Sequence, residues 1–299
     1  MTSTPFTAPV DGGAIAGGQW HADAPGLPVL AVHGITASHR AWDLLADGLP
    51  ERRVIAPDLR GRGRSNRLPA PYGLDQHADD LAAVLDALGV ERAFVVGHSM
   101  GAFVTVRFAE RHPDRVAGIV LVDGGLPIPA PHGIAPEDLP ALLLGPALER
   151  LAMTFPDRSA YAGFWRAHPA LGPYWNDAIA DYVDYDLVGE APELRSSANA
   201  DAVAVNALEL DGSAGYAAAL AALPGPVDFF RAPRGLQDGA PLYAEALVAA
   251  ESARMPQLVV HEVDDVNHYT ILMTAPGTGS VIDVIRTRIQ AAETQEGAS

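Results

Sequence analysis

The sequence predicts an α/β fold in which a mostly parallel, doubly wound sheet carries a helical insertion. Short apolar runs alternate with stretches of helical spacing up to residue 125, and the alternation resumes after residue 226. The segment between them is rich in proline and helical patterns and has no clear strand. We therefore expect a core domain of residues 1–125 and 226–299, interrupted by a helical cap of residues 126–225.

The expected strands are short and β-branched, and glycine, proline or charged residues bound them. This is the pattern of strands buried on both faces of a parallel sheet. They lie at residues 29–32, 53–56, 93–96, 118–122, 227–230 and 257–261. The glycine-rich opening, residues 6–20, alternates weakly and predicts one or two antiparallel strands at the sheet edge.

Apolar residues at helical spacing predict the helices that connect these strands. In the core they lie at residues 40–49, 74–88, 100–111, 242–253 and 280–292. In the insertion they lie at residues 137–155, 159–168, 175–188 and 199–210.

The composition excludes several classes of chemistry. All 20 basic residues are arginine and there is no cysteine. A Schiff-base lysine, a P-loop lysine, a cysteine nucleophile and cysteine-ligated metal sites are therefore ruled out. The formal net charge of -17 disfavours nucleic acid and anionic membranes as partners. About half of the acidic excess falls in residues 126–225, which we expect to disfavour anionic substrates.

We expect a cytoplasmic protein, because the sequence has no signal-peptide pattern and no apolar stretch long enough to span a membrane. No metal site is expected. The acidic group Asp181, Asp184 and Asp186 lacks the glycine and the closing glutamate of a calcium loop. A solvated helix face is the better interpretation of that group.

The most informative segment is Gly97-His98-Ser99-Met100-Gly101, which joins an expected strand to an expected helix. A serine in such a tight turn stands above the carboxyl edge of the sheet, and side chains two residues away on either side would clash. The amino end of the helix also favours a nearby oxyanion. Ser99 is therefore the candidate nucleophile.

Two backbone amides are the candidate oxyanion donors. Met100 follows the nucleophile, and Ile35 lies in the loop after the strand at residues 29–32. We expect His33, in the same loop, to shape the loop through a hydrogen bond rather than to act as a base. The candidate base is His268, which lies in a polar loop after the last expected strand.

His33-Gly34, the run from Asp58 to Ser65, the serine turn and the late His268 resemble the α/β-hydrolase superfamily. The resemblance covers nearly the whole chain and implies a cap at residues 126–225 and a Ser-His-acid triad. It implies a structural role for the loop that contains Arg60, Arg62 and Arg64.

The resemblance leaves the triad acid open between two positions. The family usually places the acid after the strand that follows the cap, which favours Asp238, although Asp238 lies two or three residues later than the usual spacing. Some relatives place the acid at the end of the strand before the cap, where Asp123 lies. Asp264 and Asp265 are too near His268 in sequence to be well placed behind its ring.

The expected function is hydrolysis of a carboxylic ester through an acyl-enzyme, with no metal or organic cofactor. A serine nucleophile disfavours the relatives that use aspartate, such as epoxide hydrolases. Thioesterase, lactonase and C–C hydrolase activities would use the same residues, and a non-catalytic binding protein is the alternative from another class. We expect a small, neutral and partly apolar substrate, with aromatic residues of the cap near it. The sequence does not predict the oligomeric state.

Overall fold

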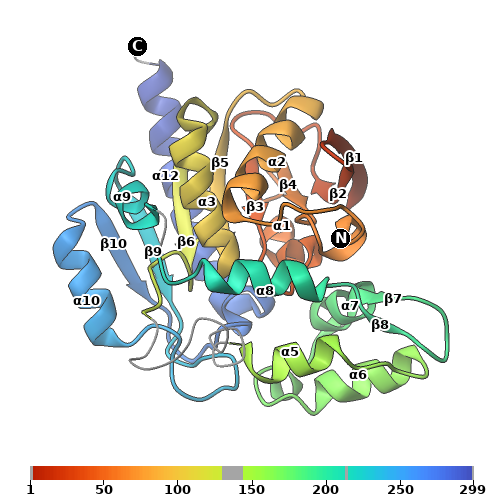
Figure 1. Cartoon of the computed structure of the whole chain (residues 1–299). Coiled ribbons are helices and arrows are strands. Elements are labelled where there is room, and N and C mark those ends of the chain that lie inside the picture. The colour runs from red at the N-terminus through yellow and green to blue at the C-terminus, as the bar shows by residue number, and fades with distance from the viewer. Residues whose placement is uncertain (1–2, 130–143, 213–214, 298–299) are drawn as a thin grey trace.

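The computed structural model describes residues 3–129, 144–212 and 215–297. An eight-stranded sheet forms its centre, in the order β1-β2-β4-β3-β5-β6-β9-β10 (Figure 1). The strands from β4 to β10 are parallel, whereas β1 and β2 are antiparallel at one edge. The predicted fold class is thereby confirmed. The bounds of the strands are β1 Thr4–Val10, β2 Gly13–Trp20, β3 Val29–Val32, β4 Val54–Pro57, β5 Ala93–His98, β6 Val116–Val122, β9 Val227–Arg231 and β10 Leu258–Glu262.

Side-chain alternation along the central strands divides the core into two layers. In β5, Val95 belongs to one apolar cluster, whereas Phe94 and Val96 belong to the other. The first cluster includes residues of α2, α3, α9 and α10, and the second includes residues of α1, α11 and α12. Both faces of the parallel strands are therefore covered, which explains their uninterrupted apolar sequences. These helices are α1 Asp43–Asp47, α2 Leu74–Ala87, α3 Met100–Arg111, α9 Tyr216–Ala221, α10 Glu245–Arg254, α11 Thr270–Met273 and α12 Ala275–Gly297.

The insertion between β6 and β9 contains most of the elements that lie beside the carboxyl edge of the sheet. Figure 1 shows α5, α6, α7 and α8 together along this edge. A short antiparallel pair, β7 and β8, and the helix α9, which packs on α3, were not predicted. The helix predicted at residues 137–155 lies partly outside the described residues. The bounds are α5 Pro146–Leu151, α6 Arg158–Arg166, α7 Asp177–Asp186, β7 Leu187–Val188, β8 Arg195–Ser196 and α8 Ala200–Leu208.

A buried aspartate joins the insertion to the core. Asp58, after β4, accepts hydrogen bonds from the ring and main chain of His39 at 2.9 Å and from the Tyr185 hydroxyl of α7 at 2.6 Å. Burial by itself would raise the pKa of Asp58, but the hydrogen bond from His39 holds it at about 2. Asp181 of α7 forms a second link, to Arg40 at 2.9 Å. No partner of His39 was predicted from the sequence.

A second polar cluster lies inside the insertion and corrects the expectation of a solvated acidic helix face. Asp186 is 5% exposed and pairs with Arg150 at 2.8 Å. It also accepts hydrogen bonds from Tyr161 and Ser197. Because a buried carboxylate is costly unless it is paired, this cluster fixes α5, α6 and the end of α7 against one another. Asp181 and Asp184 do face solvent, as expected.

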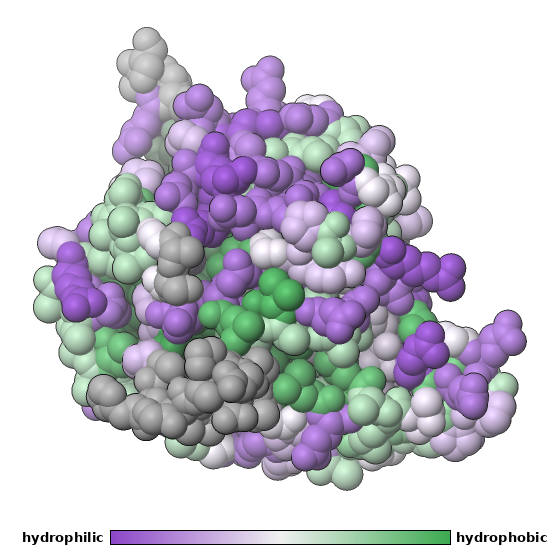
Figure 2. Space-filling view, in the orientation of Figure 1, coloured by the Kyte–Doolittle hydropathy of each residue, from purple (hydrophilic) through white to green (hydrophobic). Residues whose placement is uncertain are grey.

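Hydrophobic residues gather near the middle of the molecular face shown in Figure 2. The helix α8 crosses this face, and its Val205 and Leu208 are each 41% exposed. Within the described residues, no helix has the length and apolar character needed to cross a membrane.

Candidate active site

Ser99 occupies a strained turn at the junction of β5 and α3. Its backbone has φ 54° and ψ -125°, a conformation that residues other than glycine rarely adopt. The flanking glycines make the turn possible. A Cβ on Gly97 would lie 2.4 Å from the Gly101 oxygen, and a Cβ on Gly101 would lie 2.0 Å from the Val32 oxygen. The hydroxyl is therefore held at the carboxyl edge of the sheet, in front of the amino end of α3.

A third glycine beside this turn was missed in the sequence. Gly124 follows β6, and a Cβ at this position would lie 2.1 Å from the Ser99 carbonyl oxygen. The amide of Ser99 donates to Val122 at 3.0 Å. The end of β6 thus fixes the main chain of Ser99 from the side opposite β3. In the sequence, the Gly124-Gly125 pair after the strand was the feature that could have indicated this close approach of two main chains.

The loop after β3 is held by two buried side chains. Leu59 donates its amide to Nε2 of His33 at 2.9 Å, so Nδ1 of His33 donates to the Gly34 oxygen at 2.8 Å. Burial lowers the pKa of His33 to about 4, which keeps the ring neutral. Arg62 donates to the Ile35 oxygen at 2.9 Å. His33 and Arg62 therefore have structural roles, as expected, because they hold the carbonyl groups of Gly34 and Ile35 on either side of the Ile35 amide nitrogen.

The loop after β10 brings His268 to the carboxyl end of β6. Nδ1 of His268 lies 2.6 Å from Oδ2 of Asp123, and the two residues are 3% and 0% exposed. The other oxygen of Asp123 accepts the amide of Ala232 at 3.1 Å. A carboxylate in this position fixes the ring and leaves Nε2 of His268 available for another partner.

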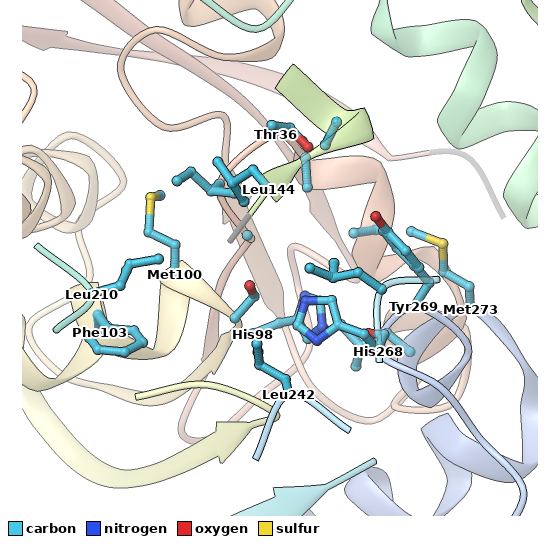
Figure 3. Close-up of a pocket in the computed structure, with 18 of the residues that line it drawn as sticks. Thr36, His98, Met100, Phe103, Leu144, Leu210, Leu242, His268, Tyr269 and Met273 are labelled. Atoms are coloured by element: carbon cyan, nitrogen blue, oxygen red, sulfur yellow. The ribbon is translucent and has the colours of Figure 1, made fainter. Parts of the chain in front are cut away.

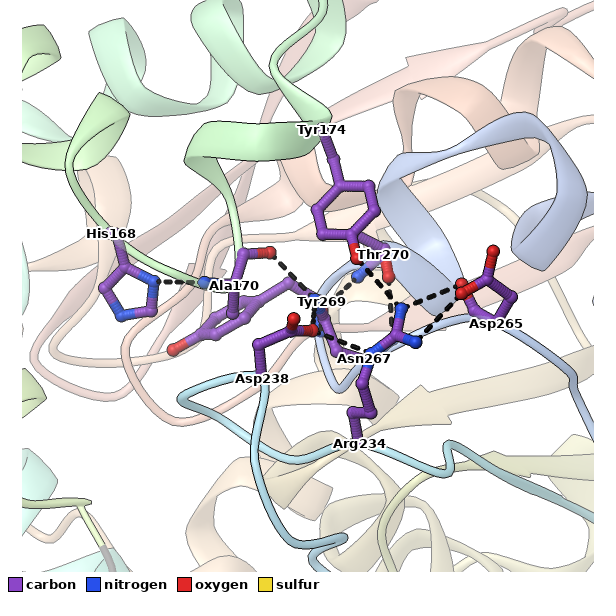
Figure 4. A network of polar contacts seen from close by, with 9 residues as sticks. All are labelled: His168, Ala170, Tyr174, Arg234, Asp238, Asp265, Asn267, Tyr269 and Thr270. Carbon is purple, nitrogen blue, oxygen red and sulfur yellow. Dashed lines mark hydrogen bonds and ion pairs between the residues drawn. The ribbon is translucent and has the colours of Figure 1, made fainter.

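Asp238, the acid that the sequence favoured, lies in a different network (Figure 4). Its Oδ1 accepts hydrogen bonds from Arg234 at 2.8 Å and from Asn267 at 2.9 Å. Arg234 also pairs with Asp265 at 2.9 Å. Asp238 thus binds Asn267, the residue that precedes His268 in the sequence. The carboxylate that contacts the His268 ring belongs to Asp123. The network orders the loop that carries His268.

His98 also contacts His268. Its Nε2 donates to the His268 main-chain oxygen at 2.8 Å, and the two ring centroids are 4.6 Å apart. Burial, followed by the neighbouring His268, lowers the pKa of His98 well below its usual range. The His98 ring therefore packs beside the candidate base and holds its backbone.

One pocket brings the predicted residues together, because Ser99, His268, Ile35 and Met100 all line it. Figure 3 shows His98 and His268 between Phe103 and Leu210 on one side and Tyr269 and Met273 on the other. Most of the lining is apolar, and none of the described lining residues is arginine, aspartate or glutamate. The described lining residues from the insertion are Ile128, Leu144, Ala147, Tyr182 and Leu210. One of these, Tyr182, is aromatic.

The described residues contain no group of three or more histidine and acidic side chains arranged to hold a metal ion. The polar groups at the pocket include the Ser99 hydroxyl, the His268 imidazole with buried Asp123 behind it, and the main chain of Ile35 and Met100.

Curated relatives match parts of the chain. Lipase LipV of Mycobacterium tuberculosis is 46% identical over 95 residues, 32% of this chain and 36% of the lipase. A 2-hydroxymuconate semialdehyde hydrolase of Pseudomonas sp. is 38% identical over 120 residues, 38% of this chain and 42% of that protein. Epoxide hydrolase B of M. tuberculosis is 34% identical over 175 residues, 56% of this chain and 45% of that protein. The chain thus spans less than half the length of these relatives.

Solved structures match over nearly the whole chain. An E-2-(acetamidomethylene)succinate hydrolase has a TM-score of 0.76 and 25% identity, and the match covers 96% of this chain and 100% of that one. A thermophilic esterase from Thermogutta terrifontis has a TM-score of 0.68 and 24% identity over 98% of this chain and 99% of its own, which shows the fold alone. The family described as alpha/beta hydrolase fold matches residues 28–259. The chain therefore belongs to the α/β-hydrolase family.

Proposed function

We propose that this hydrolase cleaves carboxylic esters through the nucleophile Ser99, the base His268 and the acid Asp123. The observation that carries the proposal is the buried 2.6 Å contact between Asp123 and His268, beside a pocket that Ser99 lines. Asp123 fixes the tautomer in which Nε2 of His268 accepts the proton of Ser99. Asp238 is not part of this proposal, because its accepted hydrogen bonds come from Arg234 and Asn267.

The proposed reaction has two steps. Ser99 attacks the acyl carbon as His268 takes its proton, and the amides of Ile35 and Met100 stabilise the oxyanion. His268 then returns the proton to the leaving alcohol, which leaves an acyl-enzyme. Water activated by His268 attacks the acyl-enzyme and releases the acid and free Ser99.

A neutral, apolar acyl group suits the pocket best. None of its described lining residues carries a guanidinium group, and the sequence of residues 130–143 contains neither arginine nor lysine. A substrate carboxylate inside this pocket would lose its hydration without gaining a cationic partner. The lack of a cationic partner disfavours the carboxylate-bearing substrates that the names of two compared hydrolases suggest. The serine at position 99 disfavours the reaction of epoxide hydrolases, which use an aspartate nucleophile.

Activity on two sets of p-nitrophenyl esters tests this proposal. The first set is an acyl series from acetate to decanoate, and the second compares butyrate with the hemisuccinate, which has a similar length and an added carboxylate. We expect turnover of the neutral esters, a clear loss for the hemisuccinate, and no turnover by Ser99→Ala. Equal rates for the variant and the wild type would refute the proposed nucleophile. Preference for the hemisuccinate would refute the proposed substrate class.

A C–C hydrolase is the second candidate, because one curated relative is a 2-hydroxymuconate semialdehyde hydrolase and the reaction can use the same three residues. Assaying that semialdehyde beside the butyrate ester separates the two candidates. Faster cleavage of the semialdehyde would favour the C–C hydrolase.

A further inference from the structure

A second cleft, separate from the pocket of Ser99, contains an unusual group of arginines. It lies where the short helix η2, Gly63–Ser65, meets the β7–β8 pair and the beginning of α8. Arg64, Arg67 and Arg195 line it, and all three are exposed. We call this site the arginine cleft.

The arginines of this cleft lack the acidic partners that most arginines of this protein have. In the described part of the chain, no carboxylate forms an ion pair with Arg64, Arg67 or Arg195. The neighbouring groove is different, since Arg40 pairs there with Asp181 and Arg158 with Asp184. The chain has 37 acidic and 20 basic residues. Three arginines in one cleft without an ion pair to a described carboxylate therefore concentrate positive charge that is not neutralised.

The remaining lining of the cleft is also suited to an anion. The helix α8 begins there at Ala200, and Asn199 caps it by accepting the amide of Asp201 at 2.9 Å. The positive end of the helix dipole adds to the field of the arginines. The Asp201 side chain is the single acidic group among the described residues that line the cleft, so positive charge prevails.

Arg64 is held in place within this group. Its guanidinium lies 4.2 Å from the centre of the Tyr185 ring, and the Tyr185 hydroxyl donates to buried Asp58. A guanidinium oriented by stacking loses less freedom when it binds an oxyanion, and its planar donors match phosphate and carboxylate groups.

We propose that the arginine cleft binds a small anion with two or more negative charges, of the phosphate or polycarboxylate class. Small size follows from the charge distribution. The net charge of -17 repels an extended polyanion, whereas the field of the cleft acts on a small ligand within a Debye length of about 10 Å. The site lies close to the active-site pocket, because Ala147 of α5 lines the pocket and Leu151, about 6 Å further along the helix, lines the cleft.

Calorimetric titration of the full chain at low ionic strength tests this inference, with inorganic pyrophosphate and citrate as the two probes. We expect saturable binding of at least one probe, and the stronger probe identifies the phosphate or the carboxylate class. The double variant Arg67→Gln/Arg195→Gln should bind about tenfold more weakly or worse, because it lacks two charged donors. Its melting temperature should not change, since neither side chain has an acidic partner in the described chain.

Arg166→Gln is the matched control. Arg166 also lacks an ion pair with any described carboxylate, but it lies over Trp175, outside the cleft. This variant should bind both probes as the wild type does. Failure of the wild type to bind either probe, or equal weakening by Arg166→Gln, would overturn the proposed site. Because the measurement is binding and not turnover, its result is independent of the proposed ester hydrolysis.

Discussion

Replacing Asp123 by asparagine should reduce turnover far more than replacing Asp238 by asparagine. Asparagine has the shape of aspartate, so its oxygen can still accept the amide of Ala232 at the 3.1 Å position. Its amide nitrogen would then face Nδ1 of His268 at the 2.6 Å position. Two N–H groups cannot share that contact, so the ring must place its proton on Nε2 instead. His268 in that tautomer cannot accept the proton of Ser99.

The expected loss in kcat is about 10⁴-fold, the magnitude typical of a triad whose histidine has the wrong tautomer. This corresponds to about 5.5 kcal/mol of transition-state stabilisation. Substrate binding should change little, since Asp123 does not line the pocket. Asp238→Asn keeps an acceptor for Arg234 and should cost less than about tenfold in kcat. Both variants should be assayed with p-nitrophenyl butyrate over a range of pH, with melting temperatures as the control for folding.

The outcome that would refute this reasoning is specific. If Asp238→Asn lost as much activity as Asp123→Asn, or more, the contact with the His268 ring would not identify the triad acid, and the assignment of Asp123 would be refuted. A mild effect of both substitutions would show that turnover does not depend on a carboxylate behind His268.

Three further predictions concern the stability of the fold and the surroundings of the site. Burial lowers the pKa of His77 from 6.5 to about 3. Its contribution to the free energy of unfolding is therefore present above pH 6.5 and is lost as the pH falls toward 3, at up to roughly 1.4 kcal/mol per pH unit. Urea unfolding of His77→Gln should therefore depend less on pH between 6.5 and 4; parallel curves would contradict this. His98→Phe removes the donor to the His268 oxygen and should lower kcat about 100-fold, which a loss confined to KM would disprove. Gly124→Ala places a Cβ 2.1 Å from the Ser99 oxygen, so kcat should fall sharply, and wild-type turnover would exclude the close approach.

The parallel strands and the serine turn could be predicted because their signals are local. The strand at residues 93–96, the helix at 100–111 and the serine between them are encoded in one continuous stretch, and the structure has β5, Ser99 and α3 there. The loop role of His33 was expected from its place after the strand at residues 29–32, whereas the structural role of the loop with Arg62 was implied by the family resemblance. Residues 6–20 were harder to interpret, because glycine weakens the alternation, although they form two antiparallel strands.

The position of the acid could not be decided from the sequence because it depends on distant segments. Asp123 and His268 are 145 residues apart, and they meet because the ends of β6 and β10 lie on opposite sides of β9 at one edge of the sheet. Asp238 lay nearer the usual family spacing, but Arg234 and Asn267 hold it away from the ring. Neither partner was apparent without the fold.

The polar connections of the insertion were equally hidden. Asp186 looked like part of a solvated face, yet Arg150 and Tyr161 from other helices enclose it. The net charge did not predict the local charge of the arginine cleft. The insertion has an excess of acidic residues, yet three exposed arginines line the cleft beside it. Charge counts describe the long-range field, whereas binding depends on which side chains share a concave site.

The central claim is that Ser99 is a nucleophile activated by His268. The most direct measurement is mass spectrometry of the folded protein after reaction with a fluorophosphonate, followed by peptide mapping of the adduct. We expect one adduct, on Ser99, with none on Ser99→Ala and much slower formation on His268→Ala, because the base is removed. An adduct on another residue, or a folded wild-type protein that remains unlabelled, would contradict the claim.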